Sequence, residues 1–285
     1  MVSTYNQQLL VSKDALPTMP KGVIFDMDGT LIEQKVDFVK LSRDICEVAD
    51  NDIIGQHREW DRDDLAKAMA NVSIDGQRKI KQIIGEECQR ALECMTIQEG
   101  GPELVEFLAQ NGVRRAILTR NYENNALHMQ QMYLDVKSDA TFDLVIGRDT
   151  HYNKIETLEG EVSKSERILH ICELWGCSPS EVIMVGDSIK DDILEGNRAG
   201  ASTVLLEPEG YMLNNVYGTN SGNSMERKPN VRIESLLELK LLLEEQTARR
   251  SMDCWQSTIR ALEMEIDNSI SSQSSAPITT VKVNE

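Results

Sequence analysis

Two aspartates stand two residues apart near the start of the chain, at the end of a short apolar run. Residues 23–25 are apolar and lead directly into Asp26, and Asp28 follows after one methionine. If the chain stays extended, side chains at positions i and i+2 point to the same side, so both carboxylates reach one point. Crowded like charges are costly, and Mg²⁺, which prefers a few carboxylate oxygens together with waters and a phosphate oxygen, would neutralise them. The pair predicts a magnesium site at Asp26 and Asp28.

The same spacing suits phosphoryl transfer. An ionised carboxylate is a competent nucleophile toward phosphorus. The second carboxylate, if it is kept apart from the cation, can be protonated by crowding and act as a general acid.

Polar residues also follow two later apolar runs. Thr119, Arg120 and Asn121 come after "AIL", and Asp187 comes soon after "VIMV". Each exit alone is equally well explained as a turn or a helix N-cap. Three exits together favour one shared site, because ligands of open parallel α/β sheets bind beyond the carboxyl ends of the strands.

A further group of acidic residues lies in "GDSIKDD". Asp187, together with Asp191 or Asp192, could complete the cation site. The interval from Asp192 to Gly196 favours Asp192, and the other aspartate would cap the following helix or face solvent.

Apolar runs alternate with helical patterns after residue 97. The runs "RAILTR", "FDLVIG", "VIMVGD" and "TVLL" are continuously apolar, as strands covered on both faces are. Helical patterns at 102–111, after Tyr122, at 164–175 and up to Gly200 separate them. This alternation predicts an α/β fold, a Rossmann-like parallel sheet with helices on both faces. Residues 33–96 lack a convincing strand and predict an all-helical cap inserted after the first strand.

The predicted organisation has six parts. They are a flexible leader (1–19), a catalytic core (20–32 and 97–212), the helical cap (33–96), a flexible loop (213–230), a C-terminal helix (231–266) and a disordered tail (267–285). The C-terminal helix is too densely apolar at "LLELKLLLEE" for a clean heptad, so we expect it to dock onto its own core.

The composition limits the classes of binding partner. A net charge of −17 and a pI near 4.7 argue against nucleic acid or an anionic membrane as the main partner. No apolar run approaches the roughly 18 residues of a membrane span. The six cysteines form no C-x-x-C pair and no zinc spacing, which indicates buried or free thiols in a reducing compartment. We therefore expect a cytoplasmic protein, a monomer or weak dimer.

The ordered motifs resemble those of the haloacid dehalogenase superfamily. "DMDGT", "LTRN", Lys164 opening a helix, and "GDSIKDD" with "EGNRAGASTVLL" look like its four motifs, over roughly residues 20–210. The first motif alone is fairly specific, and the four in order are much more so. The helical insert lies where many relatives carry a small helical cap, as in phosphoglycolate phosphatase, and such caps usually go with small soluble substrates.

The resemblance implies a role for each matching residue. Asp26 would be the nucleophile that becomes phosphorylated, and Asp28 would protonate the leaving group and then activate water. The main-chain carbonyl of Asp28 and the carboxylate of Asp187 would hold magnesium. Thr119 would hydrogen-bond the phosphoryl oxygens, and a lysine would neutralise the charge on them during transfer.

The third motif departs from the pattern, because the Lys-Pro that relatives with this cap often show is missing between residues 148 and 170. Lys154 and Lys164 are the two candidates. Lys164 is favoured, because it opens a helix about three turns before a glycine. The alternative interpretation of either lysine is a solvated surface position, where most lysines lie.

The pattern as a whole predicts a magnesium-dependent phosphatase that hydrolyses a small phosphorylated metabolite through a phosphoaspartate. Thr119, Arg120 and Asn121 are the expected substrate-binding residues. The second aspartate of the first motif favours phosphoryl chemistry over carbon–halogen cleavage, because the dehalogenases of the superfamily usually lack it. A phosphomutase would use the same residues, and a catalytically weakened relative could serve as a binding module.

Overall fold

The computed structural model describes residues 16–33, 35–52, 72–150, 162–208 and 225–274. Its centre is a six-stranded, fully parallel sheet with the strand order β3-β2-β1-β4-β5-β6. The strands are β1 (Gly22–Phe25), β2 (Arg114–Leu118), β3 (Leu144–Ile146), β4 (Val182–Gly186), β5 (Ser202–Leu206) and β6 (Val231–Ile233). Phe25 lies opposite both Ile117 and Val185, so β1, β2 and β4 end at nearly the same level. The polar residues that follow these three strands, which were predicted to share a site, therefore lie at one edge of the sheet.

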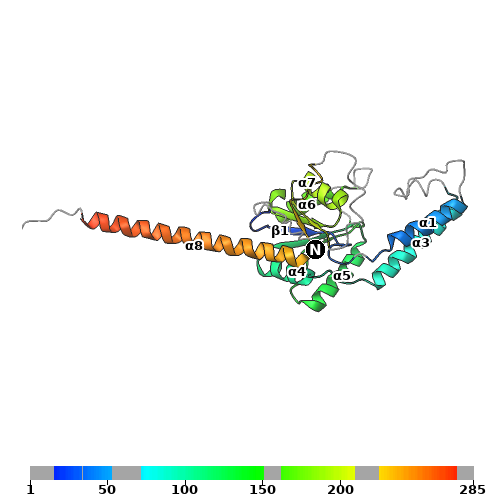
Figure 1. Cartoon of the computed structure of the whole chain (residues 1–285), viewed down its shortest axis with the longest axis horizontal. Coiled ribbons are helices and arrows are strands. Elements are labelled where there is room, and N and C mark those ends of the chain that lie inside the picture. Colours follow the sequence, from blue (N-terminus) through cyan, green and yellow to red (C-terminus); the bar gives the residue numbers. More distant parts are fainter. Residues whose placement is uncertain (1–15, 34, 53–71, 151–161, 209–224, 275–285) are drawn as a thin grey trace, which may run out of the picture.

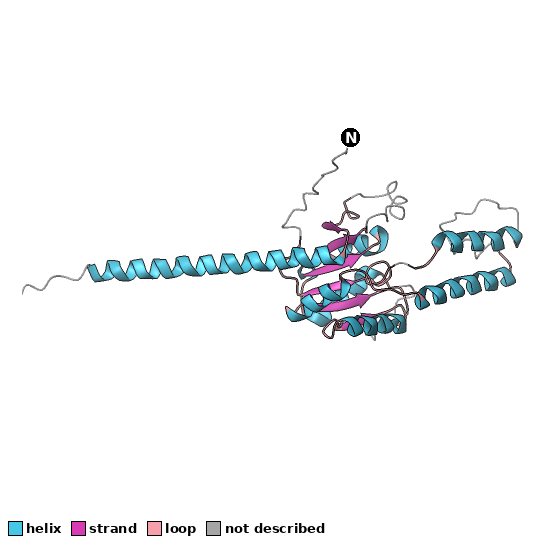
Figure 2. Cartoon of the chain, turned by 60° about the horizontal axis from the view of Figure 1, so that its bottom comes forward, coloured by secondary structure: helices cyan, strands magenta, loops and turns pink. Residues whose placement is uncertain are grey.

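Helices cover both faces of the sheet, as predicted (Figure 2). Val23 and Phe25 of β1 point into one apolar core, and Ile24 points into another on the opposite face. The first core is closed by α4 (Gly101–Gln110), α5 (Glu123–Val136) and the start of α8 (Leu236–Ser274). The second is closed by α6 (Lys164–Trp175) and the end of α7 (Leu194–Ala199). Burial on both faces explains why these strands read as continuous apolar runs.

In its described part, the inserted segment contributes the helices α1 (Phe38–Asn51) and α3 (Ile74–Glu93), which project from the sheet domain (Figure 1). Ser73 caps α3 by accepting a hydrogen bond from the backbone N–H of Gly76. The pair packs around a small core of its own, formed by Ile45, Ala49, Val72 and Ile80. The described part of this segment is helical, as predicted, and residues 53–71 of the predicted cap lie outside the described residues.

The C-terminal region differs from its prediction. Residues 231–233 form the edge strand β6, and the helix begins at Leu236 and ends at Ser274. Val231 and Ile233 are buried while Arg232 is exposed, which is strand alternation too short to stand out in the sequence. The predicted helix over 231–266 was therefore wrong at both ends, and residues 267–274 of the predicted disordered tail are helical. Residues 275–285 of that tail lie outside the described residues.

The predicted docking of α8 holds only for its first turns. Leu236, Leu239 and Leu243 are buried against the sheet, whereas Met252 and Trp255 are exposed. Figure 1 shows the helix continuing away from the sheet domain, on the side opposite α1 and α3. At the other end of the chain, Leu16 is buried in the same core, so the last residues of the predicted flexible leader are anchored.

All six cysteines are free thiols, and Cys172 is buried. Among the helices of the described residues, none is long and apolar enough to cross a membrane.

Candidate active site

Lys164 and Asp26 form the centre of the site. Asp26 follows β1, is almost fully buried, and its backbone N–H donates to the carbonyl of Val185. The ammonium of Lys164 lies 2.7 Å from Asp26 Oδ1 and 2.5 Å from Asp192 Oδ1. A third carboxylate, that of Asp191, accepts from the same ammonium at 3.2 Å. The structure thus brings Lys164 to the predicted nucleophile, while Lys154, the alternative, lies outside the described residues.

Local sequence signals fix the position of Lys164 at the first residue of α6. Ser163 and Glu166 form a reciprocal capping box, and the helix ends at Gly176 in the left-handed conformation that favours glycine. Ile168, Ile171, Cys172 and Trp175 form the apolar face of this helix and are buried against the sheet. A lysine mounted on so well-defined a helix is a pre-organised cation.

Three carboxylates converge beside this lysine. One oxygen from each of Asp26, Asp187 and Asp192 lies within 4.8 Å of the other two. Glycines make room for them, because a Cβ on Gly29 would lie 2.3 Å from Asp187 Oδ2 and one on Gly186 would lie 2.1 Å from the Asp192 carboxyl. Such a set of hard oxygen ligands in a small space fits a divalent cation.

Asp28 stands apart from this group of three. Its carboxylate accepts a hydrogen bond from Asn121 Nδ2 at 3.2 Å. The chain turns sharply after it at Gly29, whose φ of 80° is in the left-handed region. Only the main-chain carbonyl of Asp28 is therefore left as a candidate ligand, which is the role that the family resemblance implies.

Burial raises the pKa of four acids in the site, Asp26, Asp28, Asp187 and Asp192. It raises the pKa of Asp187 to about 8, with the neighbouring charges of Asp26 and Asp192 adding to the effect. It raises the pKa of Asp192 to about 7 against the opposing charge of Lys164, and the pKa values of Asp26 and Asp28 are raised by burial as well. Burial acts against the charge of Lys164, but Asp192, Asp26 and Asp191 raise its pKa above the ordinary value, so it stays protonated. The acids therefore lack positive charge that a bound cation would supply.

The three residues after β2 occupy different environments. Thr119 is buried, and its hydroxyl accepts from the backbone N–H of Asn121. Asn121 links this loop to Asp28 through its side-chain amide. Arg120 forms an ion pair with Asp191, the aspartate that was ranked below Asp192 as a metal ligand. All three predicted substrate-binding residues therefore lie at the edge of the site.

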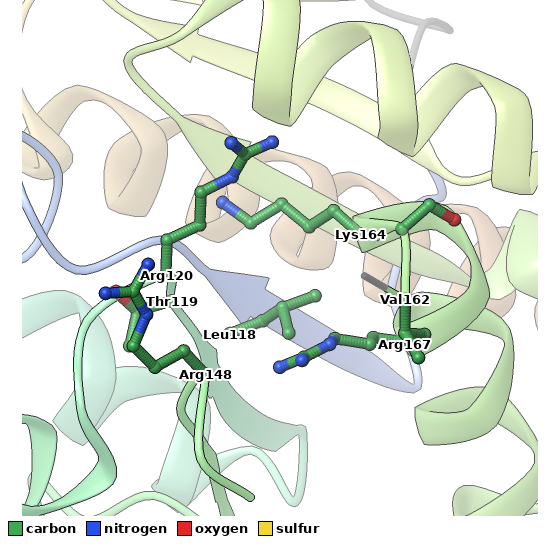
Figure 3. Close-up of a pocket in the computed structure, with 8 residues that line it drawn as sticks. Leu118, Thr119, Arg120, Arg148, Val162, Lys164 and Arg167 are labelled. Atoms are coloured by element: carbon green, nitrogen blue, oxygen red, sulfur yellow. The ribbon is translucent and has the colours of Figure 1, made fainter. Parts of the chain in front are cut away.

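Two cavities adjoin these residues. A cavity of about 550 Å³ lies between the core and α3, and its wall includes Asp28, Arg120, Asn121 and Arg148. A smaller cavity of about 110 Å³ is lined by Thr119, Lys164 and the arginines at 120, 148 and 167. Figure 3 shows Lys164 and Arg167 extending across this smaller cavity toward the other basic residues.

Sequence reasoning missed Arg148 and Arg167. Arg148 follows β3 by two residues, so a fourth strand exit was a signal that could have found it. Arg167 lies on α6 one turn after Lys164, and its guanidinium donates to the carbonyl of Gly147 at 2.7 Å. Nothing in the local sequence marks this residue.

Comparison with known proteins defines the family. Residues 20–200 match the family model of haloacid dehalogenase-like hydrolases, and residues 162–239 match a second, HAD-hydrolase-like model. A haloacid dehalogenase-like hydrolase domain-containing protein of Arabidopsis thaliana is 32% identical over 80% of this chain and 85% of its own length. The chain therefore belongs to the haloacid dehalogenase-like hydrolases, as its motifs predicted, and is an enzyme of the hydrolase class.

More distant similarities agree with this assignment. Phosphoglycolate phosphatase 1 of Pseudomonas aeruginosa is 23% identical over 78% of this chain and 79% of its own length. A HAD family hydrolase from Deinococcus radiodurans, solved with bound phosphate and sodium, superposes with a TM-score of 0.53 at 17% identity, covering 81% of this chain and 98% of that one. The structural similarity shows a shared fold.

Proposed function

We propose that the protein is a magnesium-dependent phosphatase that hydrolyses a small phosphomonoester through a phosphoaspartate at Asp26. The observation that carries this proposal is the contact between Asp26 and the buried ammonium of Lys164, beside two further converging carboxylates. A nucleophile, an ammonium that can stabilise the transferred phosphoryl group, and a candidate metal site thus lie next to one another. The family membership and the similarity to a phosphoglycolate phosphatase support action on phosphate esters.

In the first step, a carboxylate oxygen of Asp26 attacks phosphorus and the bond from phosphorus to the leaving oxygen breaks. Asp28 gives its proton to that oxygen, which suits a carboxyl whose pKa is raised by burial. Lys164 and the hydroxyl of Thr119 stabilise charge on the phosphoryl oxygens. The alcohol leaves, and the phosphoryl group is held as an acyl phosphate on Asp26.

In the second step, Asp28, now ionised, takes a proton from water. The resulting hydroxide attacks phosphorus, and the bond between phosphorus and the Asp26 oxygen breaks. Inorganic phosphate leaves and both aspartates return to their starting states. The hydrogen bond from Asn121 orients the Asp28 carboxyl in both steps.

Mg²⁺, bound by Asp26, Asp187, Asp192 and the main-chain carbonyl of Asp28, would supply Lewis-acid stabilisation of the phosphoryl oxygens. The raised pKa values of Asp187 and Asp192 support such a ligand, because these acids gain a compensating charge when a cation replaces their protons.

The test is phosphate release from sugar phosphates, nucleotides, phosphoglycolate and aryl phosphates, each with Mg²⁺ and with EDTA. Asp26→Asn should abolish release, because the amide keeps the shape but is not a nucleophile. Asp135→Asn, a matched change at an exposed position of α5, should leave it unchanged. Substantial activity in Asp26→Asn would refute the phosphoaspartate. Isomerisation of a sugar phosphate without phosphate release would identify a phosphomutase instead.

A further inference from the structure

We propose that the natural substrate carries a second anionic group, bound by Arg148, on a leaving group with a bulky apolar body. This inference rests on the proposed phosphatase function, because it assumes that the leaving group lies beside Asp28. It adds the chemical class of the substrate, which is a phosphomonoester of an acid considerably larger than a two-carbon acid.

The position of Asp28 determines where the leaving group lies. Asp28 lines the 550 Å³ cavity between the core and the helical pair, whereas the smaller cavity lined by Thr119 and Lys164 has no lining contribution from it. A carboxyl that protonates the leaving oxygen must lie within hydrogen-bond reach of that oxygen. The body of the substrate therefore occupies the larger cavity.

Among the basic residues that line this cavity, Arg148 is the one whose charge is not paired with a carboxylate of the described residues. Lys35 is paired with Glu33, and Arg120 is paired with Asp191. Within the described residues, Arg148 has no ion pair with a carboxylate; its guanidinium instead lies over the ring of Tyr122, 5.5 Å from the centroid. In a chain with a net charge of −17, an arginine that faces a cavity without an acidic partner is well placed for an anionic ligand.

Arg148 is also held close to the reaction centre. Its backbone N–H donates to the carbonyl of Asn121 at 2.9 Å, and Asn121 in turn donates to Asp28. The guanidinium is positioned by Tyr122, the next residue along that loop. One short loop therefore sets both the proton donor and the cation, which fixes their separation for a substrate with two anionic ends.

Apolar side chains also line the cavity. They are Ala91, Leu92 and Met95, from the end of α3 and just beyond it, together with Ile32 and Val36. A dry cavity of about 150 Å³ can hold a benzene molecule, so 550 Å³ is ample for a ring-sized body. A two-carbon leaving group would leave these apolar side chains in water and gain little from them.

Matched aryl esters test the two parts of the inference. We would measure kcat/KM, by phosphate release in Mg²⁺, for 3- and 4-carboxyphenyl phosphate and for the two carbamoylphenyl phosphates, their neutral isosteres. Phenylene bisphosphate tests a second phosphate as the anion, and phosphoglycolate tests a small acid. We expect the better carboxylate or bisphosphate to exceed its neutral counterpart about tenfold or more, the scale of a charge-assisted hydrogen bond at a partly solvated site.

Variants assign the effect to Arg148. Arg148→Gln should bring the ratio of acid to amide close to one, and Arg148→Lys should keep part of the preference because it keeps the charge. Arg78→Gln, at an exposed position of α3, should leave the ratio unchanged. A ratio near one in the wild-type protein, or a ratio that Arg148→Gln leaves unchanged, would overturn the assignment of Arg148.

The outcomes also separate this inference from the proposed function. Faster hydrolysis of phosphoglycolate than of every aryl acid would overturn the bulky leaving group and leave the phosphatase intact. Failure of the proposed phosphatase function would give another result: no ester would release phosphate, or Asp26→Asn would retain activity.

Discussion

Replacing Lys164 by alanine tests the centre of the site most directly. Its ammonium touches Asp26, Asp191 and Asp192, and its side chain is only 4% exposed. Water cannot easily replace a cation so deeply buried. The substitution therefore removes two things at once, the charge that stabilises the transferred phosphoryl group and the charge that compensates two buried carboxylates.

The expected magnitudes follow from those two losses. Loss of one pre-organised electrostatic group costs about 10²–10³ in kcat, so we expect a fall of about two orders of magnitude or more. Breaking a buried ion pair by removing one partner costs about 3–5 kcal/mol of stability when the remaining charge stays ionised. The pKa of Asp192 is about 7 even with Lys164 present and rises further without it. Because a folded-state pKa above the unfolded value favours the folded state at low pH, the destabilisation should be large near pH 8 and small near pH 5.5.

The assay combines kinetics and unfolding. We would measure kcat at saturating Mg²⁺ with the best substrate of the phosphate-release screen, and urea unfolding of the metal-free protein at pH 8 and pH 5.5. Lys154→Ala should change kcat by less than about tenfold, as for a group that does not touch the phosphoryl oxygens. A larger loss in Lys154→Ala than in Lys164→Ala would refute this account and place the third motif in the segment 151–161.

Two further predictions concern metal binding and the C-terminal helix. Metal-free protein should melt at a lower temperature at pH 8 than at pH 6, because Asp187 and Asp192, with pKa values of about 8 and about 7, lose stabilising protons over that interval. Mg²⁺ should raise the melting temperature more at pH 8, where it need not displace those protons, and an equal rise at both pH values in scanning fluorimetry would contradict the ligand assignment. A chain ending at residue 248 should keep its activity and melt within about 2 °C of the full chain, because the buried leucines of α8 lie before that point. Leu239→Ala is the contrast and should cost about 2–5 kcal/mol, and a large loss on truncation in the same urea titration would show that the exposed part of α8 contributes to stability.

Features set by local signals were predictable from the sequence. The helix that carries Lys164 begins at that residue and is followed by a glycine, as predicted, and its capping box and its buried apolar face are the local signals behind this. The clustering of Asp26, Thr119 and Asp187 was predictable because parallel strands end at one edge. These predictions needed only neighbouring residues and one general rule of sheet topology.

Features that depend on tertiary contacts could not be predicted from the sequence. β6 has only three residues, and its burial comes from β5 and from α8 rather than from its own pattern. The side chain of Asp28 was expected beside that of Asp26, but the turn at Gly29 and the amide of Asn121 place it elsewhere. Arg148 follows a strand of three residues, two of them only half-buried, so that strand gave a weak signal.

The charges of the site explain why crowded aspartates are tolerated and why an arginine outside the carboxylate cluster matters. Lys164 contacts the carboxylates of Asp26, Asp191 and Asp192, and a fourth carboxylate, that of Asp187, lies beside two of these. Arg120 pairs with Asp191. With all four carboxylates ionised, two positive charges are missing, and one divalent cation would supply both. The loaded site would then be close to neutral, so a phosphoryl dianion would gain little from long-range attraction to it. Discrimination between substrates must come from charge beyond this centre, and the guanidinium of Arg148 stands at that place in the cavity.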